Sequence, residues 1–140
     1  MKTVMIDTGV ILRALIGPNA GDQPEERVRF HQAAEVFRRV SRGQVQATMT
    51  DATIAEVVAS LTSPRLAGLT REDAAGRMRA LLAHSGVRIS GRAAALSALD
   101  RWSLDPSLSF SEALTIERAS ETGAVLVADY MKDLPVIDGN

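Results

Sequence analysis

The sequence predicts an α/β domain in which a central, mainly parallel sheet is flanked by helices in three layers. Short β-prone runs alternate with helical patterns along the chain, as they do where crossover helices join parallel strands. The run at 124–128 is continuously apolar, which is typical of a strand buried on both faces. A length of 140 residues with 46% hydrophobic residues supports one core, so we expect a single domain over 1–140.

The chain begins with a predicted strand that passes directly into a predicted helix. Residues 3–6 are β-prone, and a second apolar run extends from Val10 to Leu15. Asp7 therefore lies at the carboxyl end of a strand. In open α/β sheets this edge forms the crevice in which ligands bind, so Asp7 is a candidate functional residue.

A second helix is predicted to follow the loop at 17–24 and to run to about Val40. Three arginines gather near its C-terminal end: Arg38, Arg39 and Arg42. They have two interpretations, either favourable charges at a helix terminus or a contact to RNA or a partner. A second strand is predicted at 45–49.

The next helix, over 50–61, carries a second candidate acid. It is capped by Thr50 or Asp51, and its apolar stripe excludes Glu56. Periodicity therefore places Glu56 on the solvent side, among small residues. Small neighbours would also let a metal ion or another backbone approach closely, so both interpretations of Glu56 stay open.

Two further helices and a short strand are predicted in the second half of the chain. A helix begins after Thr70, a strand covers 87–89, and another helix covers 92–102. His84 is expected to serve a helix dipole rather than a metal. Trp102 is expected in the core or an interface rather than as a stacking platform for bases.

The last predicted helix begins at Ser109 and is followed by the apolar run. Ser109 and Glu112 form an S-x-x-E capping box, which explains Glu112 without any chemistry. The predicted strand at 124–128 is followed directly by Asp129, and a short edge strand is predicted at 134–137.

Composition limits the cofactor and the compartment. The chain has no cysteine and two histidines, so a metal site must use oxygen ligands, which favours Mg²⁺ or Mn²⁺ over zinc. The net charge of −1 leaves the partner open. No apolar run approaches the roughly 20 residues that span a bilayer. The N-terminal residues are predicted to form a strand rather than a signal peptide. We therefore expect a soluble, cytoplasmic protein without membrane contact.

Four carboxylates are expected to face one edge of the sheet. Asp7 and Asp129 each follow an apolar strand, and Glu56 and Glu112 lie in early turns of helices that start from that edge. Such a cluster would repel itself unless divalent cations lay between the acids. It fits metal-assisted cleavage of a phosphodiester.

The chain resembles the PIN-domain ribonucleases, in particular the VapC-type toxins of bacterial toxin–antitoxin pairs. The resemblance rests on residues 6–12, 50–58, 108–114 and 123–129 and covers essentially the whole chain. It implies a PIN-like three-layer sandwich and an endoribonuclease that uses Mg²⁺ or Mn²⁺ to activate water and hydrolyse RNA. It also implies a cognate antitoxin that blocks the site, and a homodimer.

The resemblance assigns catalytic and metal-binding roles to four acids: Asp7, Glu56, Glu112 and Asp129. Glu112 stands where the family more often has Asp. The fourth acid of the family matches Asp129 or Asp133. Asp129 is preferred because it directly follows the predicted strand. Thr8 is implied either to hold a metal-bound water or phosphate oxygen, or to cap the first helix.

Two other functions compete with the nuclease. A binding module could keep the fold, and a partner or RNA contact, without catalysis; the unusual Glu112 favours this alternative. A phosphoryl-transfer enzyme could use Asp7 as a nucleophile. A phosphatase of that kind would have a second Asp where this chain has Gly9, and a receiver domain would have paired acids at the first strand in addition to Lys132.

Overall fold

The computed structural model describes residues 1–18, 21–128, 133 and 135 and shows a mixed α/β fold. The described elements, in chain order, are β1 (Lys2–Met5), α1 (Thr8–Ile16), α2 (Pro24–Ser41), β2 (Val45–Thr48), α3 (Asp51–Thr62), α4 (Arg71–Ala83), α5 (Arg92–Leu104) and α6 (Phe110–Thr122). Every predicted helix is present within a few residues of its expected ends. The prediction of alternating strands and helices is confirmed only for the first half of the chain.

The described sheet is a single parallel pair. β1 and β2 run side by side, with Lys2 opposite Val45 and Met5 opposite Thr48. The strand predicted at 87–89 is reduced to one parallel bridge between Val87 and Ala47. The parallel arrangement was expected, but the described sheet is much smaller than the predicted one.

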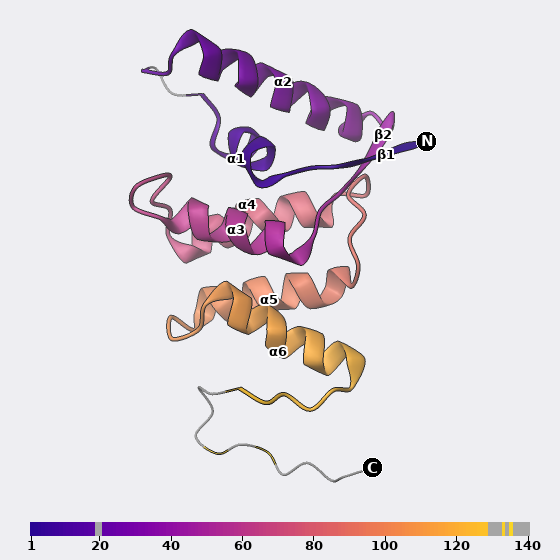
Figure 1. Cartoon of the computed structure of the whole chain (residues 1–140), viewed down its shortest axis with the longest axis vertical. Coiled ribbons are helices and arrows are strands. Elements are labelled where there is room, and N and C mark those ends of the chain that lie inside the picture. The colour runs from indigo at the N-terminus through magenta and orange to yellow at the C-terminus, as the bar shows by residue number, and fades with distance from the viewer. Residues whose placement is uncertain (19–20, 129–132, 134, 136–140) are drawn as a thin grey trace.

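The predicted strand at 124–128 is wrong in this structure. These residues form coil after α6, and the side chains of Val125 and Val127 are 68% and 49% exposed. Figure 1 shows that the chain leaves α6 at the end of the molecule remote from β1. An apolar run becomes a strand only when a neighbouring strand takes up its backbone hydrogen bonds. Except for Pro135, the predicted strand at 134–137 lies outside the described residues.

The helices form successive pairs along the long axis of the molecule (Figure 1). α1 packs against α2 and α3, and α3 also contacts α4 and α6. α5 completes the far end by packing against α4 and α6. Among the described residues, no helix is long and apolar enough to cross a membrane.

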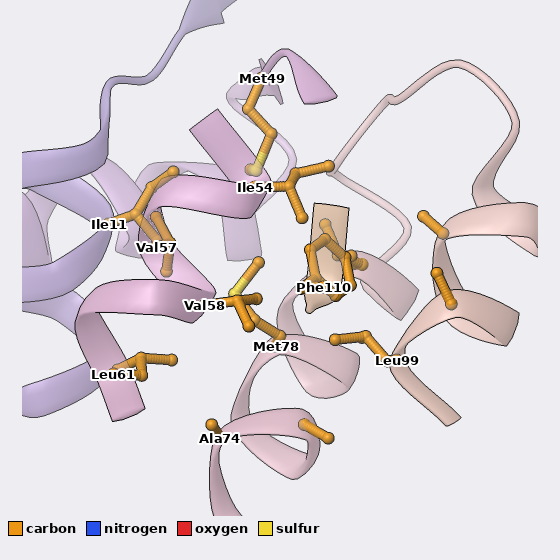
Figure 2. Close-up of a cluster of buried hydrophobic side chains, with 14 of the residues drawn as sticks. Ile11, Met49, Ile54, Val57, Val58, Leu61, Ala74, Met78, Leu99 and Phe110 are labelled. Atoms are coloured by element: carbon orange, nitrogen blue, oxygen red, sulfur yellow. The ribbon is translucent and has the colours of Figure 1, made fainter. Parts of the chain in front are cut away.

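α3 lies at the centre of the core. Its four predicted apolar positions are all fully buried: Ile54, Val57, Val58 and Leu61. Figure 2 shows Val57 beside Ile11 of α1 and Val58 beside Met78 of α4. This confirms the predicted stripe and leaves Glu56 on the exposed side of the helix.

Arg71 stabilises the connection between α5 and α6. Arg71 donates hydrogen bonds to the carbonyl oxygens of Trp102, Asp105, Pro106 and Leu108. Its guanidinium also lies 5.0 Å from the centre of the Trp102 ring, a cation–π contact. Trp102 is 3% exposed, which confirms its expected place in the core.

Asp105 forms the turn in this connection, as its position before proline predicts. Its Oδ1 accepts hydrogen bonds from Ser107 Oγ at 2.6 Å and from Ser107 N at 3.0 Å. These two hydrogen bonds hold the pKa of the Asp105 carboxyl below its ordinary value. The turn precedes α6, so it helps to set where that helix begins.

Candidate metal centre

Asp7 occupies the junction of β1 and α1, where the sequence predicts it. Ile6 is buried and continues the sheet, since its N–H donates to the carbonyl oxygen of Thr48 at 3.0 Å. The Asp7 backbone is extended, and its Oδ1 accepts a hydrogen bond from Val10 N at 3.1 Å. Asp7 is therefore the N-cap of α1, and the alternative in which Thr8 caps this helix is wrong. The Asp7 side chain remains exposed to solvent.

Thr8 joins the first helix to Glu56. Its Oγ1 donates a hydrogen bond of 2.7 Å to Glu56 Oε2. α1 packs against α3, so the two candidate acids, far apart in sequence, are linked through the residue next to Asp7. Glu56 is thus both exposed, as periodicity predicts, and held at the carboxyl end of β1.

Arg13 places a positive charge beside this pair. Its Nη1 donates to the carbonyl oxygen of Gly9 at 3.4 Å, and its Nη2 pairs with Glu26 Oε2 at 3.1 Å. A Cβ atom at Gly9 would lie 3.3 Å from Arg13 Nη1 and 3.8 Å from Asp7 Oδ1. The space left by the missing side chain of Gly9 therefore lies between the Arg13 guanidinium and the Asp7 carboxylate.

Glu112 is held in the predicted capping box. Ser109 Oγ accepts a hydrogen bond from Glu112 N at 3.1 Å, and Glu112 Oε1 accepts one from Ser109 N at 2.9 Å. Both halves of the box are present, which confirms the structural explanation. A carboxylate has about four acceptor sites, and the cap occupies one of them.

The structure brings together only part of the expected cluster. Asp7 and Glu56 are joined through Thr8, whereas Glu112 lies at the start of α6 in its own cap. Across 1–18, 21–128, 133 and 135, no three acidic or histidine side chains are grouped closely enough to hold a metal ion. Asp129 lies outside the described residues, and Asp133 is exposed.

Asp7 and Glu56 suit a hard divalent cation. Both offer carboxylate oxygens on exposed side chains, which are the ligands that Mg²⁺ and Mn²⁺ prefer. Mg²⁺ keeps several of its waters and is commonly bound by one or two carboxylates together with substrate phosphates. Asp7 and Glu56 are therefore the candidate ligands for such an ion among the described residues.

Sequence reasoning did not single out Arg13. Its signal is the spacing from Gly9, because residues four apart lie above one another on a helix. A glycine one turn before an arginine allows the guanidinium to fold back over the helix start. Asp7 and Arg13 line the same groove, so Arg13 is a candidate residue of this site.

Known proteins give no further information on this site. No model of a protein family matches the chain, and neither a curated protein nor a solved structure does.

Proposed function

We propose that the chain is a Mg²⁺- or Mn²⁺-dependent endoribonuclease that hydrolyses RNA phosphodiester bonds, and that it acts as the toxin of a toxin–antitoxin pair. The observation that carries the nuclease proposal is the 2.7 Å hydrogen bond from Thr8 to Glu56. It joins a second carboxylate to the residue next to Asp7, at the carboxyl end of β1, the edge at which α/β proteins bind ligands. The resemblance to the PIN-domain toxins supports the identity of the substrate.

The residues of the chain have separate parts in this proposal. Asp7 and Glu56 would hold the cation, which when bound supplies a water of lowered pKa and offsets charge on the phosphate. Thr8, the residue after Asp7, holds the Glu56 carboxylate at the start of α1. Arg13, held by the Gly9 carbonyl oxygen and by Glu26, lines the same groove as Asp7, where its positive charge would attract the phosphate.

Metal-dependent cleavage of RNA tests the proposal. The purified chain, free of any partner, is incubated with total cellular RNA in the presence of Mg²⁺, of Mn²⁺ or of EDTA. We expect fragments with either metal and intact RNA with EDTA. Intact RNA in all three reactions, from protein shown to be folded by circular dichroism, would overturn the assignment as a nuclease.

The finer features of the family belong to the same proposal. They are a PIN-like three-layer sandwich, a homodimer, a cytoplasmic location and a cognate antitoxin. An antitoxin segment would lie across the acid-bearing edge and present Arg or Lys to Asp7 and Glu56. Addition of the antitoxin should then stop cleavage.

A catalytically inactive binding module is the second candidate. The observation that favours it is the engagement of the Glu112 carboxylate in the α6 capping box. Such a module would bind RNA or a partner without any metal-dependent cleavage.

Replacing Glu112 with Gln separates its two possible roles. Gln also completes a capping box, so we expect the free energy of unfolding to change by less than about 0.5 kcal/mol. If Glu112 serves the metal, cleavage should fall more than about tenfold. The matched variant Ser109→Ala breaks the cap but keeps the carboxylate, so it should cost about 1 kcal/mol of stability and leave cleavage intact. Wild-type cleavage by Glu112→Gln would remove Glu112 from the site.

Replacing Thr8 with Val tests whether the hydrogen bond to Glu56 orients that acid. Val has nearly the same shape but donates no hydrogen bond, so we expect cleavage to fall about tenfold, the usual cost of losing a residue that orients a metal ligand. Thr8→Ser keeps the hydroxyl and should retain most activity. Equal rates for Thr8→Val and Thr8→Ser would show that this contact has no part in catalysis.

A further inference from the structure

A groove between α1 and α2 leads away from Asp7. It has a volume of about 280 Å³ and is lined by Asp7, Gly9 and Arg13 on one side and by Arg29, Gln32 and Val36 of α2 on the other. The proposed metal ligand and two arginines thus share one groove. A ligand that fills this groove therefore contacts Asp7.

Arg29 is available to a ligand in a way that Arg13 is not. Arg13 is 30% exposed and is fixed at both ends, by Gly9 and by Glu26. Arg29 is 61% exposed, and its ion pair with Glu26 Oε1 spans 4.0 Å. Both arginines pair with one carboxylate, Glu26, so these three side chains together carry one net positive charge.

The chemistry of the groove fits a phosphate. A guanidinium donates two parallel hydrogen bonds to phosphate oxygens, and the Gln32 amide can donate another. An anionic polymer that approaches Asp7 and Glu56 is repelled by both carboxylates, so neighbouring cations are needed to hold it. Arg29 is placed to do this without contacting the reacting phosphate.

We propose that Arg29 and Gln32 bind a backbone phosphate of an RNA strand that lies in the α1–α2 groove, next to the phosphate presented to Asp7. This inference rests on the proposed nuclease function and adds to it the path of the substrate. Contacts of this kind fix the position of a strand without reading its sequence. Arg29 is accordingly a positioning residue.

The test compares two arginines of one helix. Arg38 lies nine residues after Arg29, so at about 100° per residue it faces the opposite side of α2. It is 51% exposed and pairs with Glu35, and it does not line the groove. Arg29→Ala and Arg38→Ala therefore remove the same charge from similar exposure on opposite faces.

Binding is measured by fluorescence anisotropy with a labelled single-stranded RNA oligonucleotide in EDTA, over a range of salt concentrations. We expect Arg29→Ala to weaken binding about tenfold and to lower the slope of log K against log salt by about 0.7, the value for one phosphate contact on a single strand. Arg38→Ala should leave both quantities near those of the wild type. Arg29→Lys should keep the slope but bind less tightly than the wild type, because lysine lacks the planar fork.

Binding and cleavage together separate the failure of this inference from the failure of the nuclease proposal. Equal weakening by Arg29→Ala and Arg38→Ala, or no RNA binding by the wild type, would overturn the inference even if cleavage is observed. Weakening by Arg29→Ala alone would support the groove even if the wild type cleaves nothing. A polyglutamate peptide serves as the control ligand, and Arg29-dependent binding of that peptide without binding of RNA would overturn RNA as the occupant.

Discussion

Replacing Asp7 with Asn is expected to abolish metal-dependent RNA cleavage, with a loss of more than about a hundredfold. Residues that merely orient a metal ligand cost about 10- to 100-fold when they are removed, and Asp7 is proposed as a ligand itself. Asn keeps the size of the side chain but loses the charge that attracts the cation. Cleavage of a defined RNA in saturating Mg²⁺ measures the loss.

The same substitution should leave the fold intact. Asp7 caps α1 through a hydrogen bond from Val10 N to Oδ1, and Asn is an equally good cap. The loss of a negative charge at the helix N-terminus costs at most about 1 kcal/mol, and less repulsion of Glu56 acts in the opposite direction. Urea denaturation should therefore place Asp7→Asn close to the wild type.

A matched control uses Asp73, which is exposed in the first turn of α4. Asp73→Asn makes the same chemical change at another helix start, and we expect it to cleave RNA at the wild-type rate. If Asp7→Asn also retained full metal-dependent activity, Asp7 would not be a ligand. If both variants lost activity, the loss would reflect general electrostatics rather than this site.

Local sequence signals predicted the helices and their caps well. The apolar spacing of α3 and the Ser109–Glu112 capping box depend on residues within a few positions of one another, and both are confirmed. α6 likewise ends at Gly123, whose φ of 71° is a conformation that glycine adopts without strain. Such features depend on the spacing of nearby residues, which can be read directly from the sequence.

Features that depend on distant partners were predicted less well. The run at 124–128 has the composition of a buried strand, but a strand also needs a neighbour, and in this structure these residues are coil beyond α6. Val87 makes one bridge where a strand was expected. Composition reports how apolar a segment is, and it does not report which backbone lies beside it.

At the candidate site, too, local features were predicted well, whereas contacts between distant elements were not. Periodicity correctly placed Glu56 on the exposed side of α3, and the position of Asp7 followed from the strand that precedes it. The hydrogen bond between Thr8 and Glu56 depends on how α1 packs against α3, and no local pattern encodes that packing. The roles of all four acids remain predictions, and Asp129 lies outside the described residues.

Replacing Arg71 with Ala is expected to lower the free energy of unfolding by about 2–3 kcal/mol. The side chain donates to four carbonyl oxygens of the α5–α6 connection, at 2.6 Å for Leu108, 3.0 Å for Trp102, 3.2 Å for Asp105 and 3.3 Å for Pro106. A hydrogen bond from a charged donor contributes about 1.5–3 kcal/mol on its own. These contributions do not add, because three of the four bonds share Nη1 and part of the connection is exposed.

The single tryptophan provides a direct measurement. Trp102 lies under the Arg71 guanidinium and packs edge-to-face on Phe110, with ring centres 6.0 Å apart. Its fluorescence during urea denaturation therefore reports on the region that the substitution disturbs. Arg71→Lys keeps the charge over the ring but reaches fewer carbonyls, so its stability should lie between Arg71→Ala and the wild type.

Arg77 is the matched control, because it lies on the same helix and donates to one carbonyl, Leu15 O at 2.7 Å. Arg77→Ala should cost only about 0.5–1.5 kcal/mol, less than the range for a charged donor, because Arg77 is exposed and water competes for its one hydrogen bond. If Arg71→Ala destabilised the protein no more than Arg77→Ala, the four carbonyl contacts would not act as a unit. The start of α6, which carries Ser109 and Glu112, would then be positioned by the packing of Phe110 and by its own cap rather than by Arg71.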